Sequence, residues 1–119
     1  MSTFNLNNVF LNAQIPDVST ADQVYIPITD ETAGEVVEIR TAIDAAISGA
    51  DADITPKIGG TAMTNGLITI AQSGSAAGDT DVSRPTAART VAAGDTIEIE
   101  TDGASTGTAK LAVTIVIKR

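Results

Sequence analysis

Two stretches near the end of the chain alternate with a period of two residues. Residues 96–100 read Thr-Ile-Glu-Ile-Glu, and residues 111–117 read Leu-Ala-Val-Thr-Ile-Val-Ile. Because successive side chains of a strand point to opposite faces of a sheet, this period is typical of strands with one buried face. The stretch between them is rich in Gly, Ser and Thr, which favour turns. These residues predict an antiparallel hairpin within an all-β fold, namely an antiparallel β-sandwich of jelly-roll or Greek-key type.

The composition limits both the size of the fold and its chemistry. The 119 residues suit one domain, and the chain contains no Cys and no His. Disulfides and thiolate metal sites are therefore excluded, and so are the commonest general base and the commonest metal ligand. The net charge of -8 argues against binding to nucleic acid, which requires clusters of Lys and Arg.

The chain contains no apolar run of about 20 residues, the length that a membrane helix needs. Its first 14 residues also lack the basic and apolar regions of a secretory signal. We therefore expect no membrane partner and no export by the general pathway.

The first 20 residues differ from the remainder because they are rich in Asn and carry two of the three aromatic residues. They predict an extended N-terminal arm with one short strand at most, followed by a β-sandwich domain over residues 21–119. A frayed terminus and an edge strand of the chain's own sandwich are the alternatives. Exposed apolar side chains on such an arm favour docking on a partner or a sister subunit. The candidate interface residues are Phe4, Leu6, Val9, Phe10 and Leu11.

Other segments also favour strands. Residues 34–49 fit either a helix or a strand, and the strand is preferred because the neighbouring segments are strands. In the strand reading, one face holds Val37, Ile39, Thr41, Ile43, Ala45 and Ile47. Residues 23–28 predict an edge strand, since Pro27 cannot donate to a ladder. Asn65-Gly66 predicts a type I′ hairpin between residues 61–64 and 67–71, and residues 72–90 predict a long crossing connection with a short strand near residue 80.

Acidic residues are the one candidate for site chemistry. They occur as Asp51 with Asp53, Asp79 with Asp81, and Asp30 with Glu31. Calcium could use such oxygen ligands, but the spacing of an EF-hand loop is missing, and Asp is common in turns for backbone reasons. We therefore expect no metal and no cofactor.

Enzyme activity is not expected either. Without His or Cys, the ordinary nucleophilic triads cannot form, and Tyr25 is the only aromatic residue outside the arm that could shape a sugar-binding cleft. Sugar binding without catalysis remains an alternative, because a polar site of Asp, Asn and Thr could supply it.

Four stretches resemble small structural proteins of tailed-bacteriophage virions, in particular the capsid decoration or cement class. These stretches are Asp-Ile-Thr-Pro-Lys-Ile-Gly-Gly-Thr-Ala at residues 53–62, residues 67–79, residues 85–88, and residues 91–97. The resemblance covers about residues 22–117 and leaves the arm outside. It offers no catalytic residues to assign.

The resemblance implies a β-sandwich on the outer surface of the capsid, made in the host cytoplasm and often trimeric. The function that it implies is stabilisation of the capsid by bridging its subunits, with the major capsid protein as the partner. The alternative is a fibre, appendage or adhesin domain that binds a surface glycan. Because Phe4 and Phe10 would anchor the arm, we expect the sandwich to stay folded, but to assemble less well, when residues 1–20 are removed.

Overall fold

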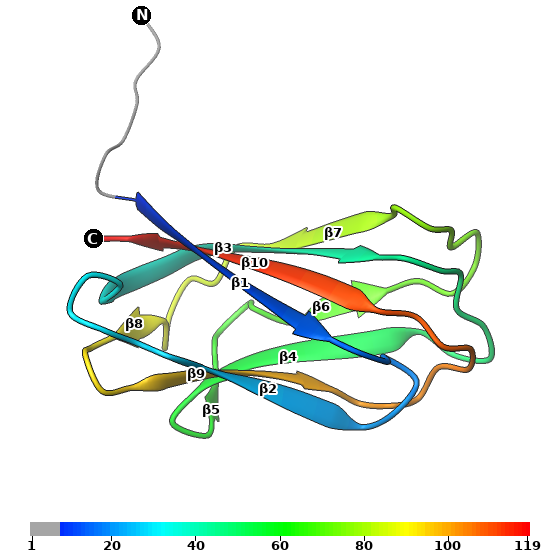
Figure 1. The fold of residues 1–119 in the computed structure, drawn as a ribbon, viewed down its shortest axis with the longest axis horizontal. Coiled ribbons are helices and arrows are strands. Elements are labelled where there is room, and N and C mark those ends of the chain that lie inside the picture. Colours follow the sequence, from blue (N-terminus) through cyan, green and yellow to red (C-terminus); the bar gives the residue numbers. More distant parts are fainter. Residues whose placement is uncertain (1–7) are drawn as a thin grey trace, which may run out of the picture.

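Residues 8–119, which the computed structural model describes, form ten strands and no helix (Figure 1). The strands are β1 (Asn8–Ile15), β2 (Asp22–Pro27), β3 (Gly34–Ile43), β4 (Ala52–Ile58), β5 (Thr61–Ala62), β6 (Ile68–Ile70), β7 (Thr80–Ser83), β8 (Thr90–Val91), β9 (Thr96–Thr101) and β10 (Leu111–Lys118).

The strands form two antiparallel sheets that pack face to face (Figure 1). Sheet A has the order β1-β10-β3-β7, and β8 also pairs with β3. Sheet B has the order β2-β9-β4-β5, and β6 also pairs with β4. The predicted all-β antiparallel sandwich is confirmed. The chain passes between the sheets at most connections, including the long one from β6 to β7, as expected for folds of Greek-key type.

The core between the sheets is aliphatic. Strands β9 and β10 bury every second residue, as their alternation predicted. Full burial of one Ile or Leu side chain stabilises a fold by about 1.5–3 kcal/mol, so this core does not need aromatic rings. Of the aromatic residues that the structure describes, Phe10 and Tyr25 are 62% and 57% exposed. Both are therefore free to serve an external role.

Residues 34–43 form a strand, so the strand reading of this segment is confirmed over β3. The predicted face is correct at Ile39, Thr41 and Ile43, which are buried. It is wrong at Val37, because a bulge pairs Glu38 with Val116 and Val36 with Ile117. Such a bulge inserts one residue into the strand and reverses the faces beyond it, so Val36 is buried in place of Val37.

The predicted hairpin between residues 96–100 and 111–117 is wrong. Strand β9 pairs with β2 and β4 in sheet B, whereas β10 pairs with β1 and β3 in sheet A. The alternation correctly predicted two strands with one buried face each. It could not predict their pairing, because a turn-rich connection can lead either to a neighbouring strand of the same sheet or to a strand of the other sheet.

The hairpin predicted at Asn65-Gly66 is also wrong. Only Asn65 has a positive φ there, whereas Gly59 and Gly60 have φ of 58° and 84° between the paired residues Ile58 and Thr61. A type I′ turn needs a positive φ at both central residues. Such a turn therefore forms at Gly59-Gly60, where it joins β4 to β5, and not at Asn65-Gly66. Strands β5 and β6 both pair with β4.

Pro56 explains this division into two short strands. Its carbonyl accepts a hydrogen bond from the Met63 amide at 2.9 Å, but Pro56 has no amide to return. The ladder on this side of β4 is therefore interrupted at its middle.

Residues 8–15 are part of the sandwich, not of an arm. Strand β1 pairs with β10 along all of its eight residues, from Asn8 opposite Lys118 to Ile15 opposite Leu111. Ile15 and Val18 are buried in the core. Among the alternatives for this segment, the edge strand of the chain's own sandwich is therefore the one that the structure has. Residues 1–7, the remainder of the predicted arm, lie outside the described residues.

Candidate interaction surfaces

The five candidate interface residues do not lie on one surface. Phe4 and Leu6 lie outside the described residues. On β1, Val9 and Leu11 are half-buried and pack against the core, while Phe10 points away from it. This division follows from the strand period of two, which the prediction of an irregular arm did not apply to these residues.

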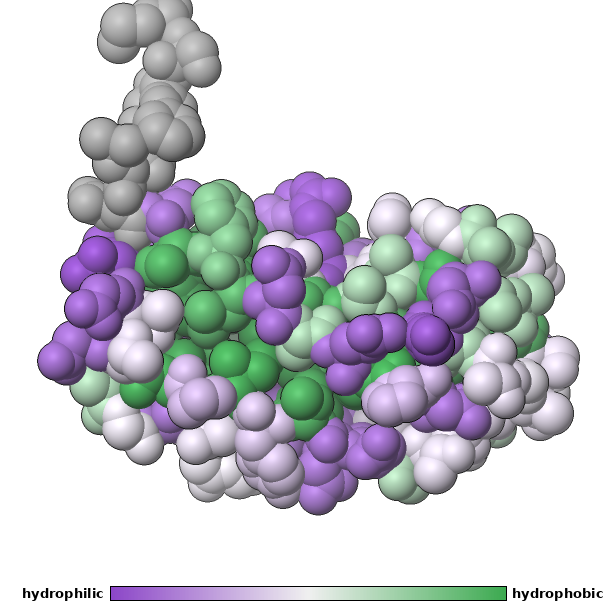
Figure 2. All heavy atoms as spheres, viewed as in Figure 1, coloured by the Kyte–Doolittle hydropathy of each residue, from purple (hydrophilic) through white to green (hydrophobic). Residues whose placement is uncertain are grey.

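An apolar strip follows one side of the sandwich, where the edge strands β1 and β2 lie in contact. Figure 2 shows hydrophobic atoms gathered on this side. The strip consists of half-buried side chains that pack against the core: Val9, Leu11, Ala13, Val24 and Ala33. We call it the β1–β2 strip.

The outer face of sheet A carries Phe10 and a cluster of one acidic and two basic side chains. Phe10 lies opposite Val116 in the register of β1 and β10. Glu38 lies opposite Val116 on the other side, and its carboxylate bonds to Arg40 and lies 3.7 Å from Arg84. Within a chain of net charge -8, this face is therefore not acidic.

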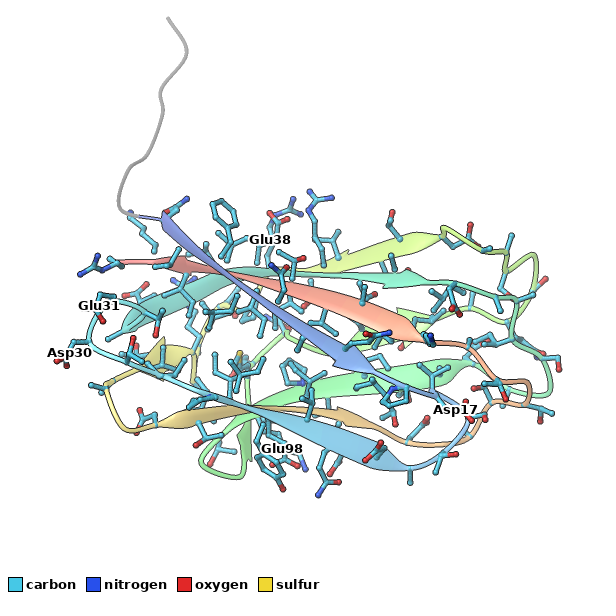
Figure 3. The ribbon with its side chains drawn as sticks, viewed as in Figure 1. Asp17, Asp30, Glu31, Glu38 and Glu98 are labelled. Carbon is cyan, nitrogen blue, oxygen red and sulfur yellow. The ribbon has the colours of Figure 1, made fainter. Side chains whose placement is uncertain are left out.

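The outer face of sheet B carries Tyr25 in a polar setting. Its hydroxyl accepts a hydrogen bond from Gln23 Nε2 at 3.1 Å, and Glu98 lies directly opposite on β9. Beyond Glu98, Lys57 forms an ion pair with Glu100 at 3.2 Å. Figure 3 shows Glu38 and Glu98 on opposite outer faces of the sandwich. The two exposed aromatic residues therefore belong to two separate surfaces.

Asp51 and Asp53 are occupied by local contacts. A carboxylate oxygen of Asp51 accepts from the Gln72 amide at 2.9 Å, and one of Asp53 accepts from the Thr69 hydroxyl at 2.8 Å. These bonds tie β4 to the strand and turn beside it. Such local bonding is the ordinary structural role of Asp near turns.

Asp79 and Asp81 flank the start of β7. Asp79 accepts from the Ala76 amide at 2.8 Å, while Asp81 lies opposite the buried Thr41 and so faces inward. Burial and the nearby charge of Asp79 raise the pKa of Asp81. Its contribution to stability therefore weakens as the pH rises above 3.8, its value without these effects.

The remaining acidic residues lie apart. Figure 3 places Asp30 and Glu31 in the loop between β2 and β3, and Asp17 in the connection from β1 to β2. Hydrogen bonds from the hydroxyl and amide of Ser19 lower the pKa of Asp17. Within residues 8–119, no three acidic side chains come together as a metal site.

Two shallow hollows mark the surface of the described region. One, of about 460 Å³, lies beside β8 and is lined by Ile58, Thr86 and Ala87, with Glu35 and Arg89. The latter two bond to each other at 3.1 Å, so their charges are already satisfied. The other hollow, of about 380 Å³, includes Asp79 and Asp81.

No helix in residues 8–119 is long and apolar enough to cross a membrane.

No model of a known protein family matches the chain, and no curated protein matches its sequence. Solved structures do match its fold. One is a chain from the acid-stable capsid structure of Helicobacter pylori bacteriophage KHP30. The match has a TM-score of 0.61 and 10% identity, and it covers 98% of this chain and 90% of that chain.

A second match is CsCBM6-3 from Clostridium stercorarium, solved in complex with cellobiose. Its TM-score is 0.54 at 12% identity, and the match covers 99% of this chain and 86% of that chain. At such identities the likeness establishes the fold alone. The chain therefore has a sandwich fold that is found in a phage capsid structure and also in a sugar-bound protein.

Proposed function

We propose that this protein is a virion structural protein that decorates the outer capsid and stabilises it by bridging capsid subunits. The observation that carries the proposal is the likeness of fold, over nearly the whole of both chains, to a chain of a phage capsid structure. The resemblance of residues 22–117 to decoration proteins points to the same role, although no family model and no curated sequence matches the chain.

The proposal includes the partners and the place of action. The major capsid protein is the partner, and no nucleic acid, membrane, cofactor or catalytic step takes part. The protein is made in the host cytoplasm and ends on the outer surface of the virion. It self-associates; the resemblance favours three copies, whereas the unprotected edge of β1 favours two.

Phe10 is the side chain that we expect to anchor the capsid contact. It is large, aromatic and 62% exposed, and it lies on the face where Glu38 bonds to Arg40 and lies near Arg84. A few aromatic residues commonly supply most of the binding energy of an interface. The two arginines beside Glu38 would also reduce repulsion between this acidic protein and a negatively charged surface.

Co-sedimentation with capsids that lack this protein tests the proposal. We expect saturable binding at a fixed ratio to the major capsid protein, and Phe10→Ala should weaken it about tenfold or more. Tyr25→Ala is the matched control, because it removes an equally exposed ring from the opposite face and should leave binding unchanged. If the unaltered protein fails to bind at micromolar concentration, the decoration role is refuted.

The second candidate function is a glycan-binding appendage domain. The observation that favours it is Tyr25, whose exposed ring lies beside Gln23 and Glu98 on sheet B. A ring for stacking and polar groups for hydroxyls together can bind a sugar. On a glycan array, this function predicts specific signals that Tyr25→Ala abolishes and Phe10→Ala retains. An array without signals, alongside binding to capsids, would exclude it.

A further inference from the structure

Sheet edges expose unpaired backbone groups, and proteins usually protect them with charges, prolines, bulges or short strands. Three of the edges in this sandwich are protected in these ways. Strand β2 contains Asp22 and Pro27, β7 is four residues long and turns Asp81 inward, and β5 and β6 have two and three residues.

Strand β1 has none of these protections. It is eight residues long, it contains no charged residue, Pro or Gly, and its register with β10 runs without a bulge. Its outer edge has no partner strand within residues 8–119. Its inward side chains also belong to the half-buried β1–β2 strip. This edge therefore suits the addition of another strand.

Charge indicates which strand can be added. Two copies of a chain with net charge -8 repel each other, and the acidic loops would bring like charges together. An uncharged edge is a place where two copies can meet without such a clash. We propose that β1 of one copy pairs antiparallel with β1 of a second copy, which joins their A sheets into one.

The geometry of β1 fixes the register. Ile15 is fully buried and is followed by Pro16, so the segment with a usable edge runs from Asn8 to Gln14. Leu11 is its midpoint. Opposite residues must also face the same side of the sheet, which a two-fold axis at Leu11 satisfies. Leu11 then lies opposite Leu11 of the second copy, and Val9 lies opposite Ala13.

This register brings side chains of the same character together. It places the inward residues of the β1–β2 strip against the same residues of the second copy. It also places the polar side chains of Asn8 and Gln14 opposite each other on the outward face of the joined sheet.

Single cysteines test the register directly, because the chain contains no Cys. Residues directly opposite in an antiparallel pair have Cα atoms about 4.5–5.5 Å apart, which a disulfide can span. Leu11→Cys should therefore form a covalent dimer on mild oxidation. Ala13→Cys should not, because its two copies would lie roughly 14 Å apart. The reverse result, or cross-linking of neither variant, would overturn the register.

Sedimentation equilibrium of the full chain tests the contact itself. We expect a mass of twice 12.1 kDa for the unaltered protein. The double variant Asn12→Lys/Gln14→Lys places charges on the outward face of β1 and should be monomeric. Val82→Lys/Thr80→Lys is the matched control, because these residues occupy the same two rows at the opposite edge of sheet A and should leave the dimer intact.

The other outcomes exclude the pairing without deciding the capsid role. A trimer, as the resemblance implies, would refute the β1–β1 pairing. So would a dimer that persists in the Asn12→Lys/Gln14→Lys variant. A monomer that dimerises only after removal of residues 1–7 would show that the chain covers its own edge. Capsid binding by the monomeric β1 variant is measured separately, so failure of this pairing and failure of the decoration role give different results.

Discussion

A chain that lacks residues 1–20 is expected to be unfolded, contrary to the sequence-based expectation that it would only assemble poorly. The deletion removes β1 and with it two fully buried side chains, Ile15 and Val18. Their burial alone contributes about 3–6 kcal/mol, and the total stability of a domain is typically 5–15 kcal/mol. The deletion also exposes one side of β10, whose inward residues are all buried in the intact protein. Far-UV circular dichroism and a thermal scan would measure the loss.

Removal of residues 1–7 is the matched control. It keeps every residue of β1, so we expect the melting temperature to change little. Any effect of this shorter deletion on capsid binding would then be assigned to the segment that holds Phe4 and Leu6. A cooperative melting transition in the 1–20 deletion would contradict the placement of β1 in the sandwich.

Gly103→Ala is expected to have the largest effect of any glycine-to-alanine change outside the strands. Gly103 has a φ of +68°, and a Cβ there would lie 2.4 Å from the Ala21 amide nitrogen. Strain at a positive φ costs about 1–2 kcal/mol, and forced overpacking adds about 1–3 kcal/mol. We expect the free energy of unfolding to fall by about 2–5 kcal/mol, measured from the midpoint of chemical denaturation.

Gly94→Ala separates the two contributions. Gly94 also has a positive φ of +92°, but no atom lies within 4 Å of a Cβ built there. Gly94→Ala should therefore lower the free energy of unfolding by about 1–2 kcal/mol, from backbone strain alone. Equal losses for both variants would show that the close approach of Gly103 to Ala21 does not add to the cost.

Local pattern predicted most strands but few of their partners. The alternation at residues 96–100 and 111–117 specified which side chains are buried, since burial depends on the strand period. It did not specify that β9 and β10 lie in different sheets, because pairing depends on contacts between distant segments. The bulge near Val37 and the division of the ladder at Pro56 likewise arise from neighbouring strands.

The candidate interface stays a prediction, but the structure gives the exposure of three of its residues. Phe10 is exposed on the outer face of sheet A, as a contact residue must be. Val9 and Leu11 pack against the core, because an eight-residue strand, and not an irregular arm, holds them. The signal was present in the alternation of Val9, Leu11, Ala13 and Ile15 with polar or exposed neighbours, but the Asn-rich composition concealed it.

The position of β10 has a consequence for synthesis in the cell. This strand comes last in the sandwich, yet it lies between β1 and β3 at the centre of sheet A. During translation, the earlier strands of that sheet must wait with their inward faces uncovered until β10 leaves the ribosome. Pairing between segments so far apart in sequence is also slow. Incomplete chains therefore cannot form sheet A, which would keep truncated copies out of any assembly that requires this sandwich.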